Sequence, residues 1–201
     1  MCNPKSHSPS KLRIISGKYH GRNIVFHAAN DLRPTHNRIR ETLFNWLAPV
    51  IENSVCLDAF AGSGALGFEA LSRGAQHVTF CDISENIIQT LNNNAEKLQI
   101  DNADFLNIDF IRQNTIQNKK FDIVFLDPPF KKNLLLPAAA LLESQQLLNP
   151  HALIYVEFEK NTVDLTQLPK NWVVKKHKQT QTIEYGLYEV INAPHTPSTM
   201  K

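Results

Sequence analysis

The chain lacks the features that mark membrane, exported and metal-binding proteins. No window of about 18 apolar residues occurs, so no transmembrane helix is expected. The opening stretch, MCNPKSHSPSK, has no apolar core of the signal-peptide type. The 3 cysteines form no CxxC pair and no Cys/His cluster, which favours buried free thiols over a disulfide or a metal site. We therefore expect a cytoplasmic protein that binds no metal.

Acidic residues are scarce in the N-terminal part of the chain. Residues 1–46 contain eight Lys and Arg residues and two acidic residues, a balance of +6. Because the net charge of all 201 residues is +2, the rest of the chain carries −4. A basic portion on a mildly acidic body suggests a polyanionic partner, although a solvated charged face explains the charge alone equally well.

Apolar strand-like runs alternate with amphipathic helical segments from residue 54 onward. This alternation predicts an α/β protein with a mainly parallel sheet covered on both faces. Residues 172–179 and 183–191 are typical of a terminal pair of strands. No internal repeat and no linker divides this part of the chain, so we expect one domain over residues 36–191.

The N-terminal segment predicts a separate small element. Residues 12–15 and 22–26 are short strand-like runs separated by SGKYHG, which indicates a basic β-hairpin within residues 11–35. Residues 35–47 have helical spacing, with Thr35 or Asn37 as the N-cap. Arg38 and Arg40 cannot both lie on the apolar face of that helix, so at least one is exposed. Residues 1–10 and 192–201 are expected to be disordered tails.

A glycine turn follows the first of the later strands. GSGALG at 62–67 fits GxGxxG, which is a weak signal by itself. Acids end three successive strands, at Asp58, Asp82 and Asp109. Asp82 comes about 20 residues after the turn, where an acid can hold ribose hydroxyls. Asp58 would face a pyrophosphate unfavourably, so the pattern favours a cationic ligand without phosphate, such as S-adenosylmethionine. The predicted cofactor-binding residues are Asp58, Phe60, Ala61, Gly62, Ser63, Gly64, Asp82, Ile83, Asp109 and Phe110.

The fourth strand run leads into DPPF at 127–130. Pro128 and Pro129 fix the backbone and have no N–H, which leaves carbonyl oxygens as acceptors. Asp127 and the Pro128 carbonyl can accept the N–H groups of an amine on a planar base, while Phe130 stacks on the ring. The alternative without a catalytic role is a proline turn that ends a strand. We predict these four residues as the catalytic motif of a methyl transfer to a planar-group nitrogen.

Four stretches resemble one bacterial family closely: LRIISGKYHGR, LRPTHNRIRETLFNWL, LDAFAGSGALGFEALSRGA and FDIVFLDPPF. The chain is similar, over about residues 11–190, to the RsmD-like ribosomal RNA guanine-N2 methyltransferases. The resemblance implies a class I methyltransferase, Rossmann-like fold: a seven-stranded, mostly parallel sheet with an antiparallel last strand. It also implies transfer from S-adenosylmethionine to guanine 966 of 16S ribosomal RNA.

The same resemblance assigns the basic N-terminal segment to RNA. The expected contacts are Arg13, Lys18, Arg22, Arg33, Arg38 and Arg40. We expect a monomer that acts on an assembling or assembled small ribosomal subunit. Three features depart from the family pattern: Asp82 replaces a usual Glu, His20 replaces a common Arg, and THN at 35–37 replaces TTD or TSD.

The catalytic motif alone permits other activities. DPPF also fits amino methyltransferases that act on adenine N6 in DNA or RNA, or on a release-factor glutamine, although many of those enzymes carry NPPY. A protein of another class, a non-catalytic RNA-binding protein with the same fold, would be expected to have lost an acid or a glycine of the pattern. None is lost here.

Overall fold

The structure, a computed structural model, describes residues 10–26, 37–112, 116, 119–130 and 132–191. The predicted tails and the segment that contains Arg33 lie outside the described residues. The strands are β1 (Ser10–Arg13), β2 (Asn23–Phe26), β3 (Val55–Asp58), β4 (His77–Asp82), β5 (Ala103–Asn107), β6 (Phe121–Leu126), β7 (Leu148–Glu159), β8 (Trp172–Gln179) and β9 (Ile183–Val190). The helices are α1 (Asn37–Leu47), α2 (Ala65–Ser72), α3 (Glu85–Leu98), α4 (Leu135–Ser144) and the 3-10 turn η1 (Leu165–Gln167).

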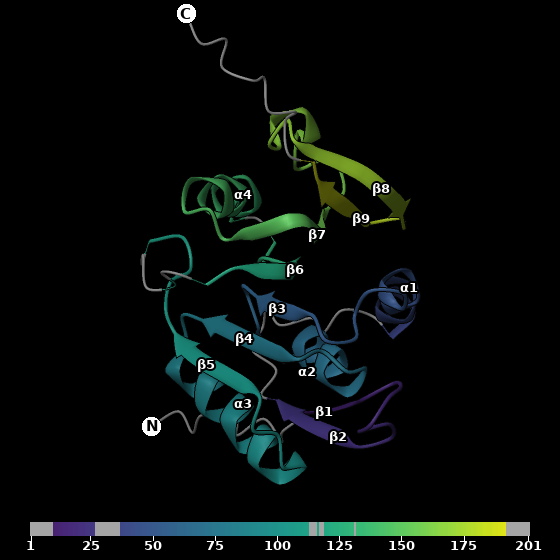
Figure 1. Cartoon of the computed structure of the whole chain (residues 1–201), viewed down its shortest axis with the longest axis vertical. Coiled ribbons are helices and arrows are strands. Elements are labelled where there is room, and N and C mark those ends of the chain that lie inside the picture. Colours follow the sequence, from purple (N-terminus) through teal and green to yellow (C-terminus); the bar gives the residue numbers. More distant parts are fainter. Residues whose placement is uncertain (1–9, 27–36, 113–115, 117–118, 131, 192–201) are drawn as a thin grey trace, which may run out of the picture.

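Seven strands form one sheet in the order β5-β4-β3-β6-β7-β9-β8 (Figure 1). The first five of these strands are parallel, and β9 is antiparallel to both of its neighbours. The chain runs outward from β3 to β5 and then returns to the other side of β3 as β6. Ligands of open α/β sheets bind at such a switch point, beyond the carboxyl ends of the strands.

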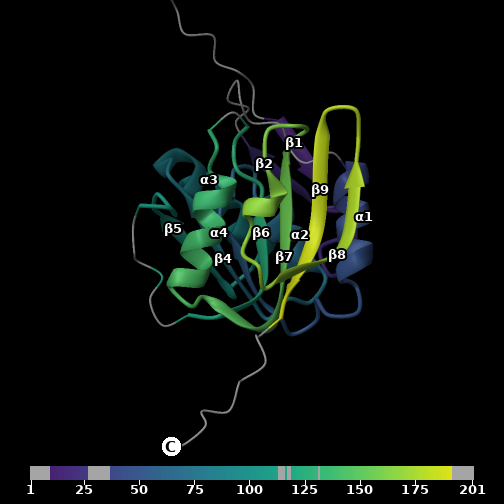
Figure 2. The same cartoon turned by 90° about the horizontal axis from the view of Figure 1, so that it is seen from above.

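Helices cover both faces of the sheet, and each face has its own apolar core. The core on one face combines α1, α2, α3 and the β1–β2 hairpin with inward side chains of the strands. The core on the other face combines α4 and η1 with the alternate strand residues. Figures 1 and 2 show the hairpin and α1 at a distance from α4. This double cover explains why the central strands are apolar along their whole length.

The structure confirms the predicted sheet with its antiparallel last strand, and β1 and β2 pair as an antiparallel hairpin. Strand β7 begins at Leu148, which pairs with Phe121 before a bulge. No helix among the described residues is long and apolar enough to cross a membrane.

Candidate active site

The glycine turn begins where β3 ends. Asp58 is the last residue of β3, is 3% exposed, and accepts a hydrogen bond from the Gly67 N–H at 3.0 Å. Gly64 precedes α2 with φ at 75°, and a Cβ there would lie 2.5 Å from Leu91. Burial raises the pKa of Asp58 to about 7, opposed by the Gly67 hydrogen bond and reinforced by the charge of Asp127. The turn therefore packs closely on α3 beside a buried carboxyl group, and Gly62 is its half-buried residue.

The turn is fastened to the end of the neighbouring strand β4. The Asp82 carboxylate accepts the Gly62 N–H at 3.0 Å with one oxygen and the Ser84 N–H at 2.8 Å with the other. The Ala61 N–H donates to the Cys81 carbonyl at 2.8 Å. Burial raises the pKa of Asp82, and the two backbone donors lower it. Because each carboxylate oxygen has two lone pairs, Asp82 can hold the turn and still accept a ligand hydroxyl.

The end of β5 differs from the prediction. Asp109 is half-buried, and its carboxylate lies 3.6 Å from the Arg112 Nε. The Phe110 ring is 3% exposed and packs edge-on against Phe60 at 6.1 Å between centroids. Phe110, predicted to bind the cofactor, has its ring in the core on the α4 side of the sheet, so the structure offers no open ring face at this position. Ile83, directly after β4 and 72% exposed, presents apolar surface instead.

The DPPF motif continues from the carboxyl end of β6, between β3 and β7. Asp127 is half-buried, Pro128 is buried and Pro129 is half-buried. Phe130 packs against the core on the α1 side of the sheet. The motif therefore brings a carboxylate, two residues without N–H groups and an aromatic ring to the switch point.

A further acid, which the sequence analysis missed, lies beside this motif. Val156 of β7 pairs with Leu126 of β6, so Glu157 follows on β7 as Asp127 follows on β6. Glu157 is 3% exposed and accepts the Tyr155 hydroxyl at 2.6 Å. Burial raises the pKa of Glu157 above its ordinary value, and the charge of Asp127 adds to this rise. We call the four acids at or near the carboxyl ends of β3, β4, β6 and β7 the strand-end acids: Asp58, Asp82, Asp127 and Glu157.

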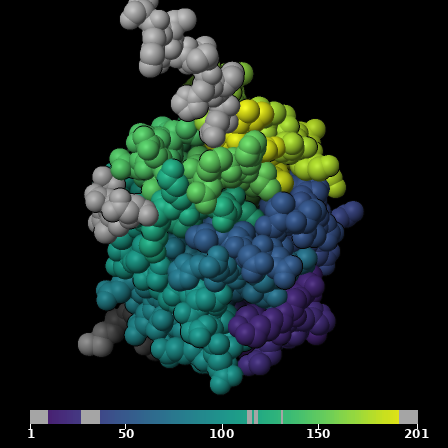
Figure 3. Space-filling view, viewed as in Figure 1, coloured from purple at the N-terminus to yellow at the C-terminus, as the bar shows by residue number. Residues whose placement is uncertain are grey.

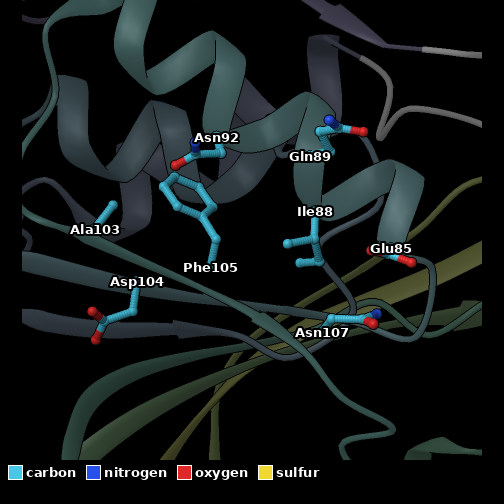
Figure 4. A pocket seen from close by; sticks show the side chains of 8 residues that line it. All are labelled: Glu85, Ile88, Gln89, Asn92, Ala103, Asp104, Phe105 and Asn107. Carbon is cyan, nitrogen blue, oxygen red and sulfur yellow. The ribbon is translucent and has the colours of Figure 1, made fainter.

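A cavity of about 560 Å³ lies outside the strand-end acids, between α3 and the edge strand β5. Its lining residues are Glu85, Ile88, Gln89, Asn92, Ala103, Asp104, Phe105 and Asn107 (Figure 4). Figure 4 shows Glu85 and Asn107 at one end and Ala103 with Asp104 at the other. The Asn107 Nδ2 donates to the Asp82 carbonyl at 3.1 Å, so the Asn107 end of the cavity lies beside the end of β4. None of the residues predicted for the site lines this cavity.

The basic hairpin is anchored to the carboxyl-terminal half of α2. Glu69, which is fully buried, accepts the Ile15 N–H at 2.8 Å and the Ser16 N–H at 3.1 Å. The Ser72 hydroxyl accepts the Tyr19 N–H at 3.0 Å, and the Ser72 carbonyl accepts the Lys18 N–H at 2.7 Å. These bonds satisfy backbone donors of the segment that joins the two strands.

Helices α1 and α3 hold the strands of the hairpin. The Asn94 side chain accepts the Val25 N–H at 3.0 Å and donates to the Val25 carbonyl at 2.7 Å. The Arg40 Nη2 donates to the Arg13 carbonyl at 2.7 Å. We call the four buried side chains that fasten the hairpin the hairpin clamp: Arg40, Glu69, Ser72 and Asn94.

The predicted RNA contacts separate into two groups. Arg13, Lys18, Arg22 and Arg38 are exposed, and the Arg22 Nη2 also lies 3.4 Å from the Lys97 carbonyl. The prediction that Arg40 reaches RNA is wrong, because its side chain is fully buried and its Nη2 caps the hairpin backbone.

The remaining two nitrogens of Arg40, Nε and Nη1, are buried and have no hydrogen-bond partner among the described residues. Burial lowers the pKa of Arg40, opposed by the charges of Glu69 and Glu41. Within the described part of the chain, no group of three or more His, Cys, Asp or Glu residues is arranged to hold a metal ion.

Comparison with known proteins gives one family. Residues 12–189 match the family described as "Conserved hypothetical protein 95". The Ribosomal RNA small subunit methyltransferase D of Haemophilus influenzae strain Rd is 46% identical over 184 residues, which cover 89% of this chain and 94% of that protein.

Solved structures share the fold. A structure from Escherichia coli, yhhF, provisionally named a methyltransferase, is 41% identical with a TM-score of 0.82 and covers 92% of this chain and 100% of that chain. A Thermus thermophilus 16S rRNA N2 G1207 methyltransferase, solved with AdoMet and guanosine, is 17% identical with a TM-score of 0.70. It covers 92% of this chain and 50% of that chain, and the likeness concerns the fold alone. The class I methyltransferase fold predicted from the sequence is thus confirmed.

Proposed function

Because the chain belongs to the family described as Conserved hypothetical protein 95, we propose that it methylates the exocyclic N2 of a guanine in 16S ribosomal RNA, with S-adenosylmethionine as methyl donor. The family assignment made from the sequence is confirmed by the 46% identity to a small-subunit methyltransferase D. The choice of guanine 966 follows from the sequence resemblance. The observation that carries the chemistry is the group of strand-end acids at the switch point of the sheet.

The glycine turn fits the proposed cofactor. S-adenosylmethionine, when bound, supplies a methyl group on a positively charged sulfur. Asp58 lies buried under the turn and matches the positive charge of such a ligand, while Asp82 retains lone pairs for ribose hydroxyls. Ile83 offers apolar surface beside Asp82 for a purine ring. Gly62 has φ at 49° and is half-buried, so its backbone is open to a ligand beside Asp82, whereas Gly64 allows the close packing of the turn on Leu91.

Asp127 and Pro128 orient the amine in our proposal. The lone pair of the guanine N2 is delocalised into the ring, so the amine is a poor nucleophile. Asp127 and the Pro128 carbonyl accept its two N–H groups, which localises the lone pair and directs it at the methyl carbon. The Asp127 carboxylate also stabilises the positive charge that develops on the nitrogen. Phe130 stacks on the base and fixes its plane.

Transfer proceeds in one step in this account, without a covalent enzyme intermediate. A new N–C bond would form as the S–C bond breaks, which would leave the donor sulfur as a neutral thioether, and the methylated nitrogen would then release its extra proton to water. The contribution of this alignment to the lowering of the barrier is on the order of several kcal/mol. The protein acts as a cytoplasmic monomer on an assembling or assembled small subunit.

The decisive experiment compares Asp127→Asn with the wild type on small subunits, naked 16S RNA, DNA and release factor. Labelled S-adenosylmethionine reports transfer, and mass spectrometry of the RNA locates the methyl group. We expect transfer only to guanine N2 of 16S RNA, lowered by roughly 100-fold or more in the variant.

Calorimetry with S-adenosylmethionine serves as the control, because Asp127→Asn should bind it about as tightly as the wild type. Full methylation by the variant would remove Asp127 from the mechanism. Failure of the wild type to bind S-adenosylmethionine would favour a non-catalytic RNA-binding protein instead.

A further inference from the structure

Strand β8 carries a basic run that the proposed function has not used. Its sequence is WVVKKHKQ, and every residue after Trp172 is exposed. β8 is the outermost strand of the sheet, so one of its edges is unpaired. Lysines on such an edge discourage pairing with other chains, a role that requires no particular direction of the side chains. The basic side chains of β8, however, are directed either to acids of β9 or to one face of the sheet.

Two of them are held by acids of the neighbouring strand β9. The Lys175 Nζ lies 2.8 Å from Glu189, and the His177 Nε2 lies 3.4 Å from Glu184. Lys176 and Lys178 form no ion pair within the part of the chain that the structure describes. They are therefore the side chains of β8 whose positive charge is available to a partner.

Both of these lysines point to the face of the sheet that carries α1 and the hairpin. Lys176 pairs with Leu187 and Lys178 with Tyr185, and directly paired residues share a face. Leu187 and Tyr185 belong to the core on the α1 side. The Lys178 Nζ lies 6.0 Å from the centroid of the Trp46 ring, within reach of a cation–π contact.

Helix α1 adds side chains to the line that Lys176 and Lys178 begin. Trp46 stacks on Tyr185 with 5.7 Å between ring centroids. Thr42 and Arg38 precede Trp46 by four and eight residues, so all three share one side of the helix. Arg38 is exposed and lies in the first turn of α1.

The line of side chains ends near the carboxyl edge of the sheet. β8 and β7 are both antiparallel to β9, so β8 runs in the direction of β7 and ends at the edge where Glu157 and Asp127 lie. The hairpin packs against α2 and α3 on the same face of the sheet. It therefore lies on the opposite flank of the strand-end acids from β8. Figure 3 shows the hairpin in purple, α1 in blue and the β8–β9 pair in yellow-green in succession along one side of the molecule.

We propose that Lys176 and Lys178 form a second RNA-binding surface, which with Arg38 holds backbone phosphates on the side of the strand-end acids opposite the hairpin. This rests on the proposed function, which makes RNA the substrate. Lysine contacts to phosphates carry no sequence information and fix the register of the bound strand. An RNA whose target base enters the site is then held on both flanks.

The experiment uses the full-length double variant Lys176→Ala/Lys178→Ala and small ribosomal subunits as the probe. We expect the affinity for subunits to fall roughly tenfold at physiological salt. The slope of log affinity against log salt should flatten by roughly one to two, since two phosphate contacts are lost. KM for subunits should rise with kcat unchanged, and the affinity for S-adenosylmethionine should equal that of the wild type.

The matched control is Lys170→Ala/Lys175→Ala, which removes the same charge from the same region but spares Lys176 and Lys178. We expect its affinity for subunits to stay within about twofold of the wild type. Equal losses in both double variants would reduce the effect to net charge and overturn the proposal. Wild-type affinity and salt slope in the Lys176/Lys178 variant would overturn it too. A wild-type protein that binds S-adenosylmethionine but methylates no RNA would instead refute the proposed function on which this surface rests.

Discussion

The hairpin clamp and the strand-end acids are both groups of buried polar side chains, yet their surroundings differ. In the clamp, the Glu69 carboxylate receives two backbone N–H groups and lies 2.8 Å from the Arg73 Nε. Among the strand-end acids, Asp127 adds negative charge beside both Asp58 and Glu157, and the pKa values of those two acids are raised. Equal burial therefore has opposite consequences for the stability of the fold. The clamp stabilises the fold, whereas burial of Asp58 and Glu157 near Asp127 disfavours their charged forms and costs stability wherever they ionise.

Loss of the clamp carboxylate should have the largest effect on stability. Glu69→Ala leaves the N–H groups of Ile15 and Ser16 and the guanidinium of Arg73 without their acceptor. We expect the free energy of unfolding to fall by about 3 to 5 kcal/mol, measured by urea denaturation.

The control for this change is Glu96→Ala, an exposed side chain on α3 whose hydrogen bond is to Asn92. It should change the free energy of unfolding by less than about 0.5 kcal/mol. A Glu69→Ala loss as small as this would mean that the clamp does not fasten the hairpin.

Two glycines of the hairpin offer a matched test of how tightly it is docked. Gly17 and Gly21 have φ angles of 84° and 81°. A Cβ on Gly17 would lie 1.8 Å from the Ser72 carbonyl oxygen, whereas one on Gly21 would meet only the end of the Arg13 side chain at 3.2 Å. We expect a loss of about 2 to 3 kcal/mol for Gly17→Ala and about 1 kcal/mol for Gly21→Ala in urea denaturation. Equal losses would contradict the close docking of Gly17 on α2.

Neutralising a strand-end acid should change stability in the opposite direction. The raised pKa of Asp58 means that its folded form keeps a proton between pH 3.8 and about 7, where the unfolded chain has lost it. The stability contributed by the protonated group is complete below pH 3.8 and is lost as the pH rises through about 7.

Asp58→Asn removes this dependence and keeps an oxygen to accept the Gly67 N–H. We therefore expect the variant to gain on the order of 2 kcal/mol over the wild type above pH 7, with little gain at pH 4. Thermal unfolding across this pH range measures the difference, and calorimetry should show weaker binding of S-adenosylmethionine. A variant less stable than the wild type at every pH would show that Asp58 is a structural acid like Glu69.

The smallest effect is expected at Glu157. Gln in this position has the shape of a protonated Glu and can still accept the Tyr155 hydroxyl, so Glu157→Gln at pH 6 should change the free energy of unfolding by less than about 1 kcal/mol. Glu157→Ala removes this acceptor and leaves a cavity, so it should cost more. Chemical denaturation of both variants at one pH makes the comparison, and equal losses would mean that the hydroxyl contact is unimportant.

The sequence predicted the acids that stand at the ends of apolar runs. Asp58, Asp82 and Asp127 each follow such a run, and a strand that stops at an acid is a local signal. Glu157 was missed because Phe158 continues the apolar pattern after it, so nothing local marks Glu157 as the neighbour of Asp127. An acid inside the run ALIYVEFE was the available signal, since a charge in a strand covered on both faces is costly.

The clamp could not be read from the sequence, because its contacts join residues far apart in the chain. Glu69 bonds to residues 53 and 54 positions earlier, and Asn94 bonds to a residue 69 positions earlier. Helical spacing showed that Arg38 and Arg40 point in different directions, but it could not show which one faced inward. Arg40 faces inward because the hairpin packs against that side of α1 and supplies a carbonyl acceptor.

Helix α2 has the glycine turn at its first residue and the clamp residues Glu69 and Ser72 in its second half. One inserted residue between Gly64 and Glu69 would rotate the clamp by about 100° and shift it by about 1.5 Å relative to the turn. The hairpin would then lose its contacts with Glu69 and Ser72 even if every side chain were kept. The number of residues between the turn and the clamp residues Glu69 and Ser72 is therefore fixed, and insertions or deletions in α2 should be excluded even where every side chain is kept.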